Sequence, residues 1–345
     1  MSVPTRGAED ETLGALGWSA FFAEQITSGD AGLEPARIAR VHRSRLTALS
    51  THGPVEPVLG PDVNTSHFAV GDFVLVDPLT ARLHRRLERR SVIERRVSGG
   101  VVPQLGGANI DTLFIVTSCN LDFNPARLER YLAWSNQAGI EPVIVLTKAD
   151  LAEDLASYED AARALQRGLD VVVVHPNEAQ TVAALAPWCG SGQTVALVGS
   201  SGVGKSTLVN TLVGATEGPP QETGAIREQD AKGRHTTTAR SLHPILGGGW
   251  VIDTPGIRSL QVSDLADGLD VLFAEITELA ARCRFHDCTH AHEPGCAVRE
   301  AVAEGTVDPK RLERWHLLQN ENAQNDRTET RAAGGRVGGG RGRRR

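Results

Sequence analysis

The sequence predicts an α/β protein built on a mainly parallel, doubly wound sheet, with a small β barrel before it and a small helical domain after it. Three observations lead to this fold class. From residue 111 onward, apolar runs of strand length alternate with helical segments, as in sheets joined by crossover helices. A glycine-rich loop joins one such run to a helix at residues 199–206. Short strand-like runs fill residues 36–102, and three cysteines cluster after residue 280.

Length and composition are those of a soluble globular protein. The 345 residues are 40% hydrophobic and 23% charged, and they suffice for two or three domains. No apolar run approaches the ~20 residues of a membrane helix. Residues 1–30 lack a signal-peptide pattern, so we expect a cytoplasmic protein without a membrane partner. Five cysteines in so long a chain do not indicate a disulfide scaffold.

The N-terminal third of the chain predicts an arm followed by a barrel. Residues 1–35 admit two interpretations, a short helix that packs on a later domain and a partly ordered arm. Several short strands in residues 36–102 suggest a barrel. Its arginines form either a solvated polar face or, as we favour, a surface for a nucleic-acid backbone. They are Arg37, Arg40, Arg43, Arg45, Arg82, Arg85, Arg86, Arg89, Arg90, Arg95 and Arg96, all expected to point outward.

Three apolar runs mark strands that precede the glycine-rich loop. They span residues 111–117, 142–146 and 171–174, and continuous apolar character is typical of strands buried on both faces. Asn124-Pro125 is expected to start a helix, as cap and first helical residue. Residues 152–167 form the next helix, so the order βαβαβ predicts a parallel sheet.

The loop at residues 199–206 matches G-x-x-x-x-G-K-[ST], between a strand at 194–198 and a helix at 207–213. Glycines let backbone N–H groups surround phosphate oxygens, and the helix adds the positive end of its dipole. Lys205 is expected to reach the β- and γ-phosphates, and Ser206 to ligate Mg²⁺. The alternative is a glycine-rich turn. The predicted contacts are Gly199, Ser200, Ser201, Gly202, Val203, Gly204, Lys205, Ser206 and Thr207.

Two further motifs predict contacts to a nucleotide, and the first of them indicates guanine. For each motif the alternative is a surface turn. Residues 147–150, T-K-A-D, follow a buried strand and are similar to N-K-x-D. Asp150 would accept hydrogen bonds from guanine N1–H and its amine, whereas adenine presents the wrong edge. The stem of Lys148 would lie over the base. In the D-T-P-G segment at 253–256, Asp253 would hold Mg²⁺ through water and Gly256 would donate to the γ-phosphate.

The order of these motifs predicts a circular permutation. Ordinary GTPases place the phosphate loop first and the base-reading motif last, whereas this chain places the base-reading motif first. The same sheet is cut between the strand before residue 253 and the strand at 112–117. The segment after Gly256 then leads into the C-terminal domain, and loss of γ-phosphate contacts is expected to move that domain.

Three positions depart from the usual motifs. Thr147 replaces Asn, which removes an amide contact and predicts weaker base affinity, and residues 174–177 offer no assignable base contact. Ile257 stands where many GTPases place a water-orienting Gln, so intrinsic hydrolysis is expected to be slow. His235 is the candidate for positioning the water, although it is equally an exposed loop histidine. Thr237 or Thr238 is the candidate for a second Mg²⁺ contact.

A cysteine cluster predicts a metal centre. Cys283, Cys288, His290 and Cys296 follow C-x4-C-x-H-x5-C, and three thiolates with one imidazole suit a closed, structural Zn²⁺ site, one per chain. Free reduced cysteines are the alternative. We expect Cys119 and Cys189 to be core thiols, and the two nearby histidines, at 286 and 292, to lie on the surface. Helices are expected at residues 264–281 and 308–319.

Together these motifs resemble the ribosome small-subunit-dependent GTPase A family, the RsgA or YjeQ type, over roughly residues 36–320. The resemblance implies an OB-fold at 36–102, a permuted GTPase domain at 103–262 and a zinc-bearing domain at 263–324. An arm at 1–35 and a disordered basic tail at 325–345, suited to RNA contact, complete the chain. The implied role is to bind the 30S subunit and its 16S rRNA late in maturation, with GTP hydrolysis stimulated by that subunit. We expect a monomer.

Three other functions stay open from the sequence. The first is a non-catalytic assembly factor controlled by GTP, which Ile257 favours. The second is another phosphate-loop enzyme, an ATPase or small-molecule kinase, which Asp150 disfavours. The third is a permuted GTPase of the large ribosomal subunit, which the barrel and the cysteine cluster disfavour.

Overall fold

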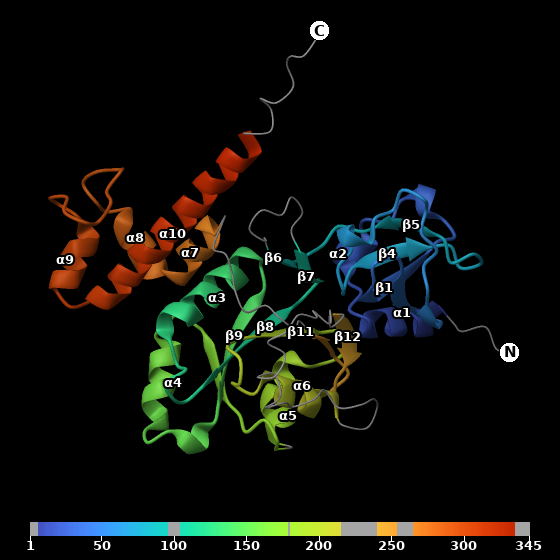
Figure 1. The fold of residues 1–345 in the computed structure, drawn as a ribbon, viewed down its shortest axis with the longest axis horizontal. Coiled ribbons are helices and arrows are strands. Elements are labelled where there is room, and N and C mark those ends of the chain that lie inside the picture. Colours follow the sequence, from blue (N-terminus) through green and yellow to red (C-terminus); the bar gives the residue numbers. More distant parts are fainter. Residues whose placement is uncertain (1–5, 96–103, 179, 215–239, 254–264, 335–345) are drawn as a thin grey trace, which may run out of the picture. The chain divides into compact units, whose positions relative to one another are not determined.

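The computed structural model describes residues 6–95, 104–178, 180–214, 240–253 and 265–334 (Figure 1). The chain forms two compact units. One holds residues 1–123, 138–162 and 170–259, and the other holds residues 124–137, 163–169 and 260–345. Across the described ranges, no helix combines the length and the apolar character needed to cross a membrane.

A central sheet organises the first unit (Figure 1). Its strands follow the order β10-β9-β8-β11-β13-β12, and all are parallel except β12. Every residue of β8 is buried. Its centre, residues 113–116, is continuously apolar, as is typical of parallel strands covered on both faces. The structure confirms the strands predicted from the four apolar runs. The strands of this part of the sheet are β8 Thr112–Ser118, β9 Glu141–Thr147, β10 Asp170–Val173, β11 Thr194–Val198, β12 Ser241–Pro244 and β13 Trp250–Asp253.

Helices α5 and α6 share the main core of this unit with the sheet. Leu185 of α5 and Leu208 of α6 are fully buried in one cluster with Phe114 of β8 and Leu197 of β11. The cluster lies beneath the glycine-rich loop, and the buried Val203 of that loop belongs to it. The helices of this part of the chain are α4 Leu155–Arg163, α5 Gln180–Leu185 and α6 Lys205–Val213, with 3-10 turns at Ala149–Leu151 and Ala186–Trp188.

The β region, defined here as residues 34–95, extends the same sheet through its first five strands, whereas its last strand belongs to a separate two-stranded sheet. Strand β1 pairs with β2 and β4, and at Arg40 it also pairs with Ser241 of β12. Small and branched side chains such as Ile38 and Val74 fill a separate core. The strands are β1 Glu34–Val41, β2 Leu46–Ser50, β3 Gly53–Val55, β4 Phe73–Val76, β5 Leu83–Arg86 and β6 Val92–Arg95; β6 pairs with β7 Gln104–Ala108. A 3-10 turn spans Thr65–His67.

The N-terminal segment is helical and packed. It forms α1 Arg6–Ala15, α2 Ala20–Ala23 and a 3-10 turn at Ser28–Asp30. The ring of Phe22, which is 1% exposed, lies 4.5 Å from that of Phe73 between centroids. Nε1 of Trp250 donates to the carbonyl of Ala15 at 2.7 Å. These contacts favour the packed helix over the partly ordered arm.

Four of the arginines expected on the outer face of the barrel have other roles. Arg37 is buried, and its guanidinium donates to Leu16 O, Asn109 O and Thr194 Oγ1. The prediction that it points outward was wrong, because β1 turns this residue toward α1 and β11. Arg85, Arg89 and Arg90 form ion pairs with Asp30, Asp72 and Asp111. Arg90 is exposed despite its ion pair, as are Arg40, Arg43, Arg45, Arg82 and Arg86. The side chains of Arg95 and Arg96 lie outside what the structure describes.

The second unit is helical. Gly268 of α7 lies so close to Ala133 of α3 that a Cβ there would stand 2.1 Å from the Ala133 carbonyl oxygen. The helix expected at 264–281 breaks in two, and the freed Leu272 carbonyl accepts a bond from Arg311. Helix α10 reaches Gly334, so residues 325–334 are helical rather than part of the expected tail. The helices are α3 Pro125–Gln137, α7 Ala266–Leu272, α8 Ala274–Ala280, α9 Ala297–Ala303 and α10 Pro309–Gly334.

Candidate nucleotide site and metal centre

The glycine-rich loop lies between β11 and α6, and its backbone requires glycine. The φ angles of Gly199, Gly202 and Gly204 are 138°, 81° and 101°, which side chains rarely tolerate. A Cβ on Gly199 would also stand 2.1 Å from the carbonyl oxygen of Val116 in β8. The loop therefore approaches the neighbouring strand as closely as a backbone can, and α6 begins at Lys205, within the motif.

The ammonium of Lys205 lies against the curve of this loop. Its Nζ donates to the carbonyl oxygen of Gly199 at 2.9 Å and also to that of Ser200. These bonds place the positive charge beside the first turn of α6, where the unpaired N–H groups of the helix point. A cation and backbone donors converging on one small volume suit a polyphosphate chain.

The base-reading segment starts at the end of β9. Thr147 is the last residue of that strand and is fully buried, whereas Asp150 is exposed in the 3-10 turn that follows. Lys148 takes a left-handed conformation, with φ 53° and ψ 40°, which turns the chain out of the strand. Oγ1 of Thr147 donates to the Val203 carbonyl of the glycine-rich loop at 2.7 Å. Two segments far apart in the sequence thus meet at one edge of the sheet, where open α/β sheets bind ligands.

Two neighbouring strands bring further residues to this edge. Strand β13 is parallel to β11 and ends at the half-buried Asp253. After β10, the carbonyl of Pro176 accepts a bond from Thr211 of α6, so residues 174–177 border the helix of the loop. Gly256, His235 and Thr237, together with Thr238 and Ile257, lie outside the described residues, and their roles stay predictions.

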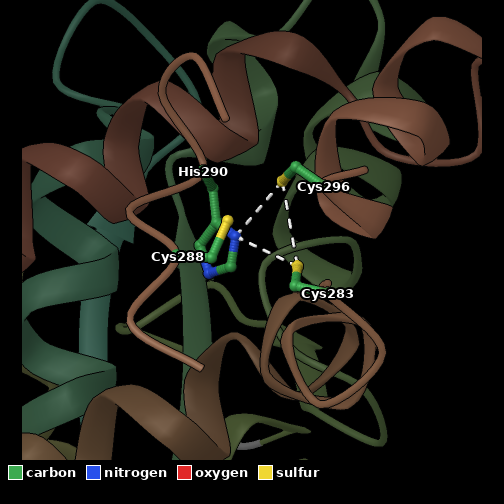
Figure 2. Close-up of side chains that lie close together, drawn as sticks. All are labelled: Cys283, Cys288, His290 and Cys296. Carbon is green, nitrogen blue, oxygen red and sulfur yellow. Dashed lines mark hydrogen bonds between the residues drawn. The ribbon is translucent and has the colours of Figure 1, made fainter. Parts of the chain in front are cut away.

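The four predicted metal ligands converge (Figure 2). One ligand atom from each of Cys283, Cys288, His290 and Cys296 lies within 4.8 Å of the others. Nδ1 of His290 is 3.6 Å from the Cys283 sulfur and 3.4 Å from the Cys296 sulfur, and the two sulfurs are 3.9 Å apart. A tetrahedral zinc with Zn–S of about 2.3 Å requires separations of roughly 3.4–3.8 Å. The cluster fits a metal ion of this kind.

The loop that carries these ligands is held by a residue that the sequence did not single out. The Glu293 carboxylate accepts from Thr289 Oγ1 and from the backbone N–H groups of residues 289, 291 and 292. These bonds, led by that of the Thr289 side chain, hold the pKa of Glu293 well below its usual range. His290 has a φ of 60° and lies 5.4 Å from the Trp315 ring between centroids. The sequence signal for this role was a carboxylate three residues after the candidate ligand His290.

The remaining cysteines and histidines behave as expected. Cys119 and Cys189 are buried, and burial raises the pKa of their thiols to about 11 and about 12. They are core thiols and not part of the metal centre. His286 and His292 are exposed beside the cluster.

Comparison with known proteins decides the family. The family model described as RsgA GTPase matches residues 86–263. A protein of Mesorhizobium japonicum named small ribosomal subunit biogenesis GTPase RsgA is 61% identical over 338 residues, which cover 98% of each chain. The chain belongs to the RsgA GTPase family. It is therefore a GTP hydrolase, and the family suggested by its motifs is confirmed.

Other RsgA proteins and solved structures agree. A Vibrio vulnificus protein named small ribosomal subunit biogenesis GTPase RsgA 2 is 47% identical over 319 residues, 92% of this chain and 90% of that protein. The crystal structure of YjeQ from Thermotoga maritima matches with a TM-score of 0.63 at 22% identity, covering 84% of this chain and 98% of that one. YloQ, described as a circularly permuted GTPase, matches with a TM-score of 0.60 at 22% identity, covering 87% and 99%. The permuted α/β fold predicted for this RsgA chain is thereby confirmed.

Proposed function

We propose that this RsgA chain is a GTPase that binds the 30S ribosomal subunit and acts during its late maturation, with hydrolysis stimulated by the subunit. The observation that supports it best is the convergence of two motifs at one sheet edge. The phosphate loop at residues 199–206 and the base-reading segment at 147–150 are joined there by the Thr147–Val203 bond. Two relatives, 61% and 47% identical over at least 92% of this chain, are named for biogenesis of the small subunit.

Phosphate binding is assigned to the loop and α6. Backbone N–H groups from Gly199 to Thr207 surround the β- and γ-phosphates, and Lys205 neutralises their charge. Ser206, Thr237 and Asp253 would hold Mg²⁺. The metal, when bound, withdraws charge from the phosphate oxygens. Gly256 donates its N–H to the γ-phosphate.

Guanine recognition is assigned to residues after β9. The Asp150 carboxylate is exposed and accepts from guanine N1–H and its amine, two parallel donors that adenine lacks. Lys148 lays its aliphatic stem over the base. In hydrolysis, water attacks the γ-phosphorus and the bond to the β-phosphate oxygen breaks, which releases GDP and phosphate. The side chain of Ile257 has no group that can position this water, so another residue must do so. We assign this role to His235.

Contact with 16S rRNA is assigned to the exposed arginines of the β region. Arg40, Arg43 and Arg45 lie at the end of β1 and in the turn to β2, and all three are exposed. Arg82 precedes β5 and Arg86 is its last residue, and both are exposed as well. Their guanidinium groups suit phosphates, whose neutralisation dominates RNA affinity. The arginine- and glycine-rich residues 336–345 are a separate candidate for RNA contact, assigned from their composition alone.

The metal centre is assigned to one structural Zn²⁺. Three thiolates and one imidazole complete a tetrahedron, so no coordination position is left for substrate. The ion would fix the loop between α8 and α9. We further propose that the protein is a cytoplasmic monomer.

One observation favours an alternative function. Ile257 in place of a water-orienting side chain favours a non-catalytic assembly factor, in which GTP sets the shape and hydrolysis is vestigial. The two functions differ in what the 30S subunit does to the rate of hydrolysis.

The deciding experiment measures GTP hydrolysis by the purified chain alone, with 30S subunits and with 50S subunits, and repeats each arm with ATP. The proposed function requires stimulation by 30S subunits only and no turnover of ATP. Binding to 30S subunits without faster hydrolysis would support the non-catalytic factor. No response to either subunit would remove the ribosome from the proposal.

A further inference from the structure

We propose that Thr147 is a positioning residue that ties the guanine-reading segment to the phosphate loop and does not itself read the base. This inference rests on the proposed guanine site and refines it. From the sequence, Thr147 in place of Asn signified only a lost amide contact. The structure gives its hydroxyl a defined partner inside the loop.

The Thr147 hydroxyl has one proton and two carbonyl oxygens within reach. Oγ1 lies 2.7 Å from the carbonyl oxygen of Val203 and 3.2 Å from that of Thr117. The shorter distance assigns the proton to Val203, because hydroxyl donors favour about 2.7–2.8 Å. All three residues are buried, so water does not replace this bond when it is lost.

Val203 and Gly204 are the parts of the loop that this bond controls. The Val203 side chain is 0% exposed in the core beneath the loop. A Cβ on Gly204 would lie 3.4 Å from Cγ of Pro176 and 4.0 Å from Cγ2 of Thr147. The loop is thus held between the ends of β9 and β10. Losing the Thr147 bond would free one side of it.

Burial separates this role from base recognition. Thr147 is 0% exposed, so a ligand at the surface does not touch it. Asp150, three residues later, is exposed and carries the acceptors that distinguish bases. One nucleotide must span both segments at once. The bond should therefore affect binding of every nucleotide that uses both segments, whatever groups its base carries.

The test compares the affinities of the full chain for GDP and for IDP, whose base lacks the amine that Asp150 accepts. Thr147→Val removes the hydroxyl at constant shape. We expect both affinities to fall by about five- to tenfold, as for an unpaired buried carbonyl, with their ratio unchanged. Thr147→Ser keeps the hydroxyl and should retain both affinities within about twofold.

Thr117→Val is the matched control. Thr117 is 2% exposed on the adjacent strand, and among the described residues its hydroxyl has no hydrogen-bond partner. This variant should bind both nucleotides as the parent chain does. A Thr147→Val variant that loses GDP but not IDP affinity, or neither, would overturn the inference. If Thr147→Val does not fold, a tenfold loss of nucleotide affinity in Thr147→Ser would overturn the inference in its place. A parent chain that binds ADP as tightly as GDP would instead reject the guanine site itself.

Discussion

Glu129 and Arg311 form an ion pair that is almost completely shielded from water. Oε1 of Glu129 lies 2.8 Å from Nη1 of Arg311, and the side chains are 0% and 8% exposed. Nε of Arg314 lies 2.8 Å from the other carboxylate oxygen, and Arg311 also contacts Glu275 at 2.8 Å. Several partners offset the cost of burying these charges. The cluster joins α3 to α10 within the second unit.

Glu129→Gln should destabilise this unit by about 3 kcal/mol, because two guanidinium groups would keep their burial and lose their counter-charge. Hydrogen exchange of the α10 amides measures the free energy of local opening. Glu278→Gln is the matched control, since its pair with Arg167 has the same 2.8 Å distance but side chains that are 68% and 61% exposed. That change should cost less than about 1 kcal/mol. Equal effects of the two variants would refute the role given to Glu129.

Arg37→Met should loosen the contact among α1, β1 and β11. The substitution keeps much of the apolar stem but leaves Leu16 O, Asn109 O and Thr194 Oγ1 without their shared donor. Losing several buried hydrogen bonds to a charged group predicts a cost of about 3 kcal/mol. Urea unfolding followed by amide exchange in β11 gives the change. Arg43→Met, at an exposed position of the same region, should leave the stability unchanged. Equal losses of stability in the two variants would contradict the structural role given to Arg37.

The strands and the nucleotide motifs were predictable because their signals are local. Continuous apolar runs such as that of β8 specify burial on both faces whatever the neighbours are. Arg37 was mispredicted because alternation along β1 does not reveal that α1 and β11 cover the strand. The break between α7 and α8 also depends on a distant residue, since Arg311 binds the Leu272 carbonyl. The bond from Thr147 to Val203 spans 56 residues, so no sequence pattern specifies it.

Cys283→Ser should abolish metal binding, because a serine hydroxyl is a poor zinc ligand and leaves a tetrahedral site incomplete. We expect about one zinc ion per parent chain and close to none in the variant, measured by elemental analysis after purification. Amide exchange in the ligand loop should rise as well, since the ion fixes that loop. His292→Ala, an exposed change in the same loop, should keep its zinc. A parent chain without zinc would mean that the cluster is four free side chains.

Asp150→Asn should exchange the base preference of the chain. The carboxylate accepts two guanine donors, whereas an amide accepts from N1–H but offers a donor where guanine presents its amine. We expect GTP affinity to fall by about a hundredfold, as for the loss of charge-assisted hydrogen bonds, and xanthosine triphosphate affinity to rise, because xanthine has a carbonyl at that position. Competition against a fluorescent nucleotide measures both constants. Asp154→Asn removes the same charge at an exposed site four residues away and should leave the preference intact. Unchanged guanine preference in Asp150→Asn would show that other residues read the base, and the T-K-A-D segment would then be an ordinary turn.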